Sequence, residues 1–165
     1  MKLMGIGAAA LALAACGSEA PKAEQEAAPP ATFPTGEWEV TSTVDGLTST
    51  DGTTPLVKVK KGDTATRKAC ITDAKELAAL FTAQDDDCKA QTAYARGGNV
   101  NSAYTCKRPG QGGTVNPTVY GKYTADSFNI TVNTGTQFSG NGDYELREKA
   151  VGKRLGDCSA APAAG

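Results

Sequence analysis

The sequence predicts a mainly β domain: one antiparallel sheet that can curl into a half-barrel, one short α-helix, and disulfide bonds that staple the fold. Three observations support this fold class. Apolar residues alternate with polar ones in several segments, which is typical of strands with one buried face. Two segments can be folded into hairpins that gather apolar residues on one face. Four cysteines besides Cys16 follow an export signal, so we expect them to form disulfides.

The first strand is expected at Trp38 to Val44, where apolar and polar residues alternate with a period of two. A polar loop is expected over 45–55. A second strand should begin at Val57 and Val59, and a turn then leads to a third strand that ends near residue 70.

One helix of about three turns is expected next, capped by Thr72. The apolar residues of this segment recur at the spacing of one helical face: Ala74, Leu77, Ala78 and Phe81. We expect the helix to cover a sheet edge or an open face.

Two hairpins follow. The first is expected to turn at Gly97-Gly98, which places Cys88 opposite Cys106 and Tyr94 opposite Val100 on one face. The second is expected to turn at 125–126. Its expected pairs are Tyr123 with Phe128, Gly121 with Ile130, and Val119 with Val132. The remaining expected elements are a Gly-rich loop over 135–142 and a last strand over 143–151.

The register of the first hairpin favours a Cys88–Cys106 disulfide, which leaves Cys70 with Cys158. The main alternative pairs Cys70 with Cys88 across the helix, and Cys106 with Cys158. Metal binding by these cysteines is not expected, because the sequence has no Cys-x-x-Cys pair and no histidine.

The amino terminus has the features of an export signal: Lys2 precedes an apolar run that is shorter than the roughly 20 residues needed to span a membrane. The run ends in Leu13-Ala14-Ala15-Cys16-Gly17, which resembles the bacterial lipobox. The resemblance implies that a diacylglyceryl group is attached to Cys16, that the signal is cut before it, and that the new amine is acylated. An ordinary signal peptide with a small-residue site at Ala12-Leu13-Ala14 is the alternative.

These features predict four parts of the chain: a signal peptide over 1–15, a lipidated and disordered Ala/Pro/Glu linker over 16–33, a β-rich domain over 34–158, and a flexible tail over 159–165. Gly17 and Ser18 follow the lipobox cysteine without an Asp. By resemblance to enterobacterial sorting, this favours the outer membrane, facing the periplasm. We therefore expect a lipid-anchored protein of the cell envelope.

Composition argues against several classes of function. Without histidine, the chain cannot form Ser-His-Asp or Cys-His catalytic arrangements. Its formal net charge is −1 and no basic stripe is present, so a nucleic-acid partner is not expected. We interpret Asp85-Asp86-Asp87 as a solvated turn rather than an acid pair or a calcium site. We expect neither enzyme activity nor a cofactor.

Four aromatic side chains are candidates for lining a ligand cavity in the curved sheet: Trp38, Tyr94, Tyr104 and Tyr123. Filling the core is the alternative role for each. The expected function is a non-enzymatic binding or structural module whose partner is an unknown envelope protein or a small ligand. One specific alternative is a carrier of a small apolar ligand in the sheet cavity. The other is an inhibitor of an envelope-attacking enzyme, which an exposed rigid loop over 135–142 would favour.

The domain opens with Gly36-Glu37-Trp38-Glu39-Val40 and closes with Gly152-Lys153-Arg154-Leu155-Gly156-Asp157-Cys158. Together with the order of the cysteines between them, these motifs resemble domain-of-unknown-function family 3617, small exported proteins of proteobacteria. The resemblance covers about residues 34–158. The family has no assigned activity, so the resemblance supports the expected fold and cysteine roles but implies no mechanism.

Overall fold

The computed structural model describes residues 28–158; the expected signal peptide, Cys16, and the tail over 159–165 lie outside this range. Seven strands form one open antiparallel sheet in the order β2-β1-β7-β6-β5-β4-β3, which confirms the predicted fold class. The elements are β1 (Gly36–Ser49), β2 (Thr64–Ile71), η1 (Ala74–Leu80), β3 (Asp87–Arg96), β4 (Asn99–Lys107), β5 (Gly113–Tyr123), β6 (Ser127–Phe138) and β7 (Tyr144–Gly156).

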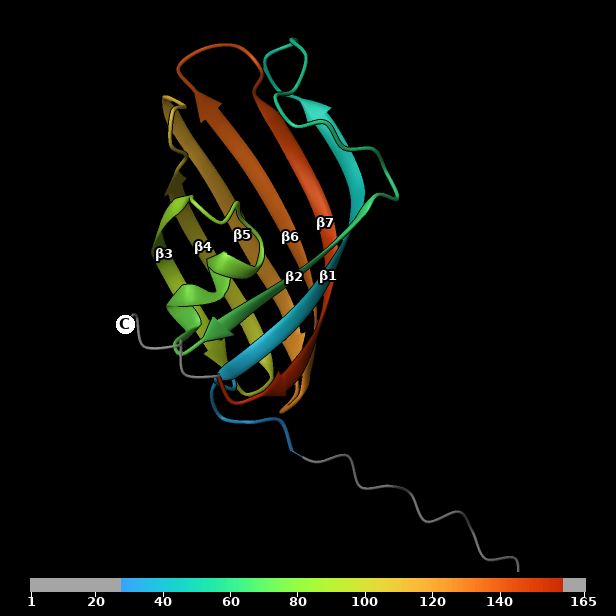
Figure 1. Cartoon of the computed structure of the whole chain (residues 1–165), viewed down its shortest axis with the longest axis vertical. Coiled ribbons are helices and arrows are strands. Elements are labelled where there is room, and N and C mark those ends of the chain that lie inside the picture. The colour runs from blue at the N-terminus through green and yellow to red at the C-terminus, as the bar shows by residue number, and fades with distance from the viewer. Residues whose placement is uncertain (1–27, 159–165) are drawn as a thin grey trace, which may run out of the picture.

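The sheet curls into a half-barrel, with β1 and β2 crossing in front of the more distant strands (Figure 1). The helix η1 contacts both edge strands, β2 and β3, and lies in the gap between them. It therefore covers the open side of the half-barrel, as expected. Within residues 28–158, no helix is long and apolar enough to cross a membrane.

The first strand has the predicted inward face, with Trp38, Val40 and Val44 buried. It continues to Ser49, so the polar loop expected over 45–55 begins only at residue 50. A register shift after Val44 allows the strand to bend and keep its pairing with β7 as far as Ser49 and Tyr144.

The strand expected at Val57 and Val59 was wrong, because these residues lie in a loop over 50–63. Their alternation has another cause. Both side chains turn toward a small apolar cluster on the sheet, formed by Val44, Tyr144 and Leu146, while the lysines beside them stay in solvent.

The helix is a 3₁₀-helix of seven residues rather than an α-helix of about three turns. Its N-cap is Asp73, not Thr72. The Asp73 carboxylate accepts from the Lys75 N–H (2.8 Å), and the Glu76 carboxylate accepts from the Asp73 N–H (3.3 Å). This capping box starts the helix one residue later than predicted. Glu76 also accepts from the Thr72 N–H, and this bond is the main reason why its pKa is lowered.

The second hairpin has the predicted register throughout, including Tyr123 opposite Phe128 and Val119 opposite Val132. The first hairpin pairs Cys88 with Cys106 as predicted, but a register shift follows between Ala90 and Thr92. Beyond it, every β3 side chain lies on the opposite face from the one expected.

Tyr94 is the residue most affected by this shift. It pairs with Asn101 instead of Val100 and is 52% exposed on the convex face. Ala95 pairs with Val100 in its place and is 6% exposed.

Both favoured disulfides are present. Cys88–Cys106 joins β3 to β4 with Cα atoms 3.9 Å apart, and Cys70–Cys158 joins the end of β2 to the segment after β7 with Cα atoms 5.5 Å apart. The alternative pairing is therefore wrong. Each edge strand of the sheet carries one of these bonds.

The predicted boundaries differ from the structure at both ends of the domain. Strand β6 includes Gly135 and runs to Phe138, so the connection to β7 is only 139–143, and β7 runs on to Gly156. Phe33, expected in the linker, is buried with its ring centroid 5.0 Å from that of Trp38. The domain therefore begins before residue 34.

Aromatic rings fill the end of the half-barrel near the amino-terminal segment. The rings of Phe33, Trp38 and Phe128 pack against one another, with centroids 5.0–6.1 Å apart. The Phe128 ring lies directly over Gly152, where any β-carbon would overlap it. The absence of a side chain at this position lets the aromatic core contact the backbone of β7.

We predict that Gly152→Ala lowers the free energy of unfolding by about 1–3 kcal/mol, because the added methyl group must displace the Phe128 ring. Gly135→Ala is the matched control, since it also lies in a strand and its β-carbon would meet no atom within 4 Å. Urea unfolding measures both. Equal stability of the two variants would contradict this packing.

Candidate ligand-binding site

A cavity of about 400 Å³ lies on the concave side of the sheet, between the loop over 50–63 and the aromatic core, where Phe81 in its wall packs edge-on against Phe128. Its wall is formed by inward residues of β1, β5, β6 and β7, and the loop over 50–63 covers it with Val57 and Val59. Most of the lining is apolar, including Val44, Phe81, Val115, Tyr144 and Leu146.

Glu148 is a carboxyl in this apolar wall. The inward residues of β7 alternate as Tyr144, Leu146, Glu148 and Ala150, so Glu148 occupies a position that its neighbours fill with hydrophobic side chains. Its register partners on the adjacent strands are Val44 and Val132, and both are buried.

Glu148 is half-buried and makes no hydrogen bond or ion pair with any of residues 28–158. Burial raises its pKa, and the charge of Arg67 offsets part of that increase. A carboxyl with a raised pKa that lines a cavity is a physical indicator of a functional site.

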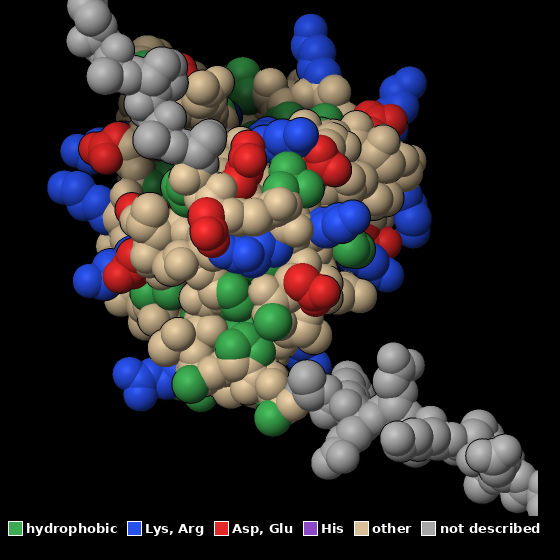
Figure 2. All heavy atoms as spheres, turned by 60° about the horizontal axis from the view of Figure 1, so that its bottom comes forward, with side chains coloured by type: hydrophobic (Ala, Val, Ile, Leu, Met, Phe, Trp, Pro, Cys, Tyr) green, Lys and Arg blue, Asp and Glu red, His purple; other side chains and the backbone are tan. Residues whose placement is uncertain are grey.

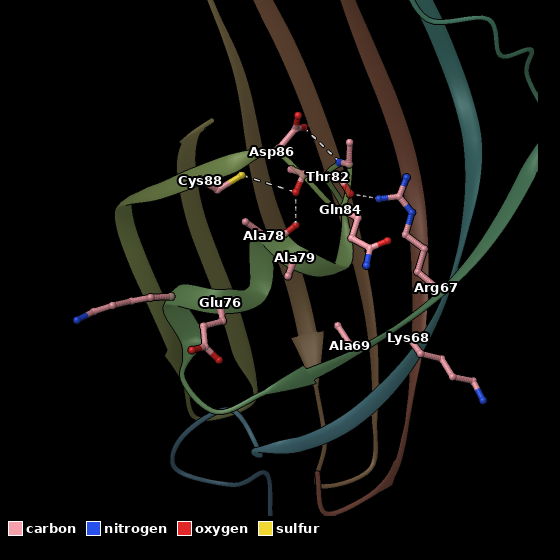
Figure 3. Close-up of a pocket in the computed structure, with 12 residues that line it drawn as sticks. Arg67, Lys68, Ala69, Glu76, Ala78, Ala79, Thr82, Gln84, Asp86 and Cys88 are labelled. Atoms are coloured by element: carbon pink, nitrogen blue, oxygen red, sulfur yellow. Dashed lines mark hydrogen bonds between the residues drawn. The ribbon is translucent and has the colours of Figure 1, made fainter. Parts of the chain in front are cut away.

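Arg67 reaches the cavity from the edge strand β2. Its register partner is the inward residue Val40, so its side chain starts on the concave side. The Arg67 guanidinium donates to the Thr82 carbonyl in the turn after η1. Figure 3 shows this side chain extending toward Thr82, whereas Lys68 points away.

A second arginine, Arg108, is already paired. Its guanidinium donates two hydrogen bonds to the Asp86 carboxylate, at 2.9 and 3.0 Å, and the Asp86 side chain is fully buried. This pair is the main reason why the pKa of Arg108 is raised. Asp86 also accepts from the Ala83 N–H (3.2 Å), which fixes the turn over 82–86.

Asp86 corrects the interpretation of the acidic run as a solvated turn. Asp85 and Asp87 are exposed, but Asp86 is the buried partner of a bidentate ion pair. No group of three or more acidic, cysteine or histidine side chains within residues 28–158 is placed to hold a metal ion.

A groove of about 710 Å³ lies outside the cavity, between β2 and the segment of η1 and the turn that follows it. The groove and the cavity share Arg67, Thr82 and Ala83, so the Arg67–Thr82 hydrogen bond forms part of the wall between them. Its lining includes polar and charged side chains such as Glu76 and Gln84 (Figure 3). The smaller cavity is more apolar, and we regard it as the candidate site.

Asp51 holds the covering loop in place. Its carboxylate accepts from the N–H and hydroxyl of Thr53 (2.9 and 2.8 Å) and from the N–H groups of Gly142 (2.8 Å) and Asp143 (3.0 Å). These bonds, chiefly that from the Thr53 N–H, hold the pKa of Asp51 well below its usual range. The loop over 50–63 is thereby tied to the β6–β7 connection.

None of the four aromatic residues predicted for a ligand cavity lines this one. Trp38, Tyr104 and Tyr123 are buried in the core, where the Trp38 indole donates to the Pro34 carbonyl and the Tyr104 hydroxyl to the Ala74 carbonyl. Tyr94 lies on the convex face because of the bulge in β3. Core filling, the alternative role, describes the three buried residues.

Sequence reasoning missed Glu148 and Arg67. The sequence contained a signal for Glu148: it is a charged residue at a position where the alternation of the last strand places apolar residues. On the molecular face shown in Figure 2, acidic and basic side chains are interspersed and no broad patch of one sign stands out.

Comparison with known proteins adds the family. The model of the family described as "protein of unknown function (DUF3617)" matches residues 29–158. The chain belongs to this family. DUF3617 membership confirms the resemblance seen in the motifs, and its match includes Phe33, which the fold also places in the domain. No curated protein and no solved structure matches the chain. The DUF3617 description names no activity.

We predict that Glu148→Gln raises the melting temperature at pH 7 by about 2–4 °C, the shift expected from about 1 kcal/mol in a domain of this size. A carboxyl whose pKa is raised by folding destabilises the protein when it ionises. Its favourable contribution is complete below the unfolded pKa of about 4.3 and is lost as pH rises through the folded pKa.

The difference between Glu148→Gln and wild type should therefore grow between pH 4 and pH 8 in thermal unfolding. Glu145→Gln is the control, because Glu145 lies on the same strand but is exposed on the convex face. A constant difference across this pH range would show that burial does not raise the pKa of the Glu148 carboxyl.

Proposed function

We propose that this chain is a lipid-anchored protein of the cell envelope whose β domain binds a small, largely apolar ligand in the concave cavity, without catalysis. One observation carries the binding role: the apolar cavity of about 400 Å³ has an inward carboxyl, Glu148, that no described residue pairs with. Ligand pockets are typically of this size, mostly apolar, with a few polar groups that orient the ligand.

The position of Glu148 is difficult to explain by stability alone. A half-buried carboxyl without an ion pair loses hydration and gains no hydrogen bond in return. Its neighbours Val44 and Val132 show that the position suits a hydrophobic side chain. Departures from simple burial rules are expected at functional or strained sites.

The arrangement of the chain is compatible with a membrane tether. The amino-terminal segment enters at the end of the half-barrel with the aromatic core, and the loop over 50–63 lies at the other end (Figure 1). A lipid on Cys16 would therefore hold the domain by the end remote from the cavity. The alternative of an enzyme inhibitor rested on an exposed loop over 135–142, and strand β6 occupies the first part of that segment.

The anchor is tested by metabolic labelling of the full chain with radioactive palmitate in bacterial cells. We expect wild type and the neighbouring control Ser18→Ala to incorporate label, and Cys16→Ser to lose it, because only the cysteine thiol accepts the diacylglyceryl group. Unlabelled wild type, or label retained in Cys16→Ser, would refute lipidation at this site.

The cavity is tested with N-phenyl-1-naphthylamine, an uncharged probe that fluoresces in apolar surroundings. We expect one saturable site on the chain from Gly17 to Gly165, which includes every described residue. Ala65→Trp should weaken binding by about tenfold or more, because Ala65 lines the cavity.

Thr66→Trp is the matched control. Thr66 is the next residue of β2, and its hydroxyl meets that of Thr41 on the convex face. It should bind the probe like wild type. Equal loss in both variants, or no saturable binding in wild type, would contradict the proposed function.

A further inference from the structure

Resting on the proposed binding function, we infer that the ligand is uncharged and carries a hydroxyl or amide group that donates a hydrogen bond to Glu148 and accepts one from Arg67. The cavity thus selects a neutral amphiphile, such as an alcohol or an amide with an apolar tail. The inference follows from the charges that face the cavity and from the hydrogen-bonding capacity they leave unused.

Four charged residues line the cavity: Asp63, Arg67, Arg108 and Glu148. The charge of Arg108 is cancelled by its bidentate bond to buried Asp86. Asp63 is exposed at the rim, where water screens its charge and its carboxylate accepts from the Lys60 N–H (2.8 Å). Arg67 is also an exposed residue, but its guanidinium is held at the cavity wall by its bond to the carbonyl of buried Thr82. Arg67 and Glu148 are therefore the charged groups that face the interior.

Arg67 and Glu148 cancel each other when both are ionised, yet they do not touch. They form no ion pair, although the charge of Arg67 acts on the Glu148 carboxyl. They approach the cavity from different strands, β2 and β7, with β1 between them. A ligand group that lies between the two side chains would face two opposite charges.

A charged head group would disturb this balance. A carboxylate would meet the like charge of Glu148, and an ammonium would meet the like charge of Arg67. In either case one net charge would remain in a largely apolar cavity, where an unpaired charge is costly. An uncharged head group leaves the balance intact.

The unused hydrogen-bonding capacity points to the same chemistry. A guanidinium has five N–H donors, and Arg67 donates to the Thr82 carbonyl. A carboxylate only accepts, and Glu148 accepts from none of the described residues. A hydroxyl or primary amide both donates and accepts, so one such group can satisfy both residues. Val57, Val59 and Leu146 would then contact the apolar tail.

The test compares three probes with the same tail and different heads: 1-decanol, decanoate and decylammonium. Each is titrated below its aggregation concentration into the chain from Gly17 to Gly165 at pH 7.5, by calorimetry. We expect 1-decanol to bind wild type at least about tenfold more tightly than either charged probe.

Two variants should reverse this order in opposite directions. Glu148→Gln leaves the charge of Arg67 uncompensated, so decanoate becomes the tightest ligand. Arg67→Gln leaves the charge of Glu148 uncompensated, so decylammonium becomes the tightest. Glu145→Gln and Lys68→Gln are controls that remove the same charges from the other face of the same strands, and they should keep the wild-type order.

The outcomes separate the two proposals. Binding of all three probes with equal affinity, or preference of wild type for a charged probe, overturns the assignment of a neutral head group while the cavity remains a binding site. Absence of binding by every probe overturns the proposed function, and the head-group assignment with it. The order reversal in the two variants supports both.

Discussion

An open antiparallel sheet has two edge strands whose outer backbone groups lack a strand partner, and this protein depends on how those two edges are held. Strand β2 is stapled by Cys70–Cys158, which reaches past β1 to the segment after β7. Strand β3 is stapled to β4 by Cys88–Cys106. The helix η1 fills the gap between the edges and contacts both. Together these features keep the sheet curled without closing it into a barrel.

A curled but open sheet needs something inside it, and the two ends of the half-barrel differ in what they contain. At one end the interior is filled by aromatic rings packed on Trp38, close enough that Gly152 has no room for a side chain. At the other end the wall carries mostly Val, Ala and Thr side chains, with Phe81 and Tyr144 among them, and is covered by a loop that Asp51 holds in place. The cavity follows from this difference in filling. Arg67 and Glu148 then place two opposite charges at its wall.

Much of the fold could be predicted from the sequence, because local pairing and alternation determined it. The β5–β6 register and the Cys88–Cys106 pair follow from short hairpins with one apolar face. The bulge after Ala90 could not be predicted, since one extra residue in β3 leaves no mark in the alternation but moves Tyr94 to the outside. Val57 and Val59 alternate like a strand because a loop lying over an apolar surface has the same pattern.

The candidate site was less predictable than the fold. Alternation correctly placed Trp38 on the inward face, but it cannot distinguish a side chain that fills the core from one that lines a cavity. That distinction depends on how far the loop over 50–63 lies from the wall, which is a property of the tertiary structure. The sequence showed Glu148 as a charged residue among the apolar positions of its strand. Its significance depends on Arg67, which lies 81 positions earlier in the sequence.

The central claim is that the concave end of the half-barrel holds a ligand rather than core side chains alone. The most direct measurement is the set of nuclear Overhauser effects between the methylene protons of bound 1-decanol and the methyl groups of the protein. Our account predicts strong effects to Val59 and Leu146, which line the cavity, and none to Val151, which is exposed on the convex face of the same strand as Leu146. Effects to Val151 without effects to Val59 or Leu146 would contradict it.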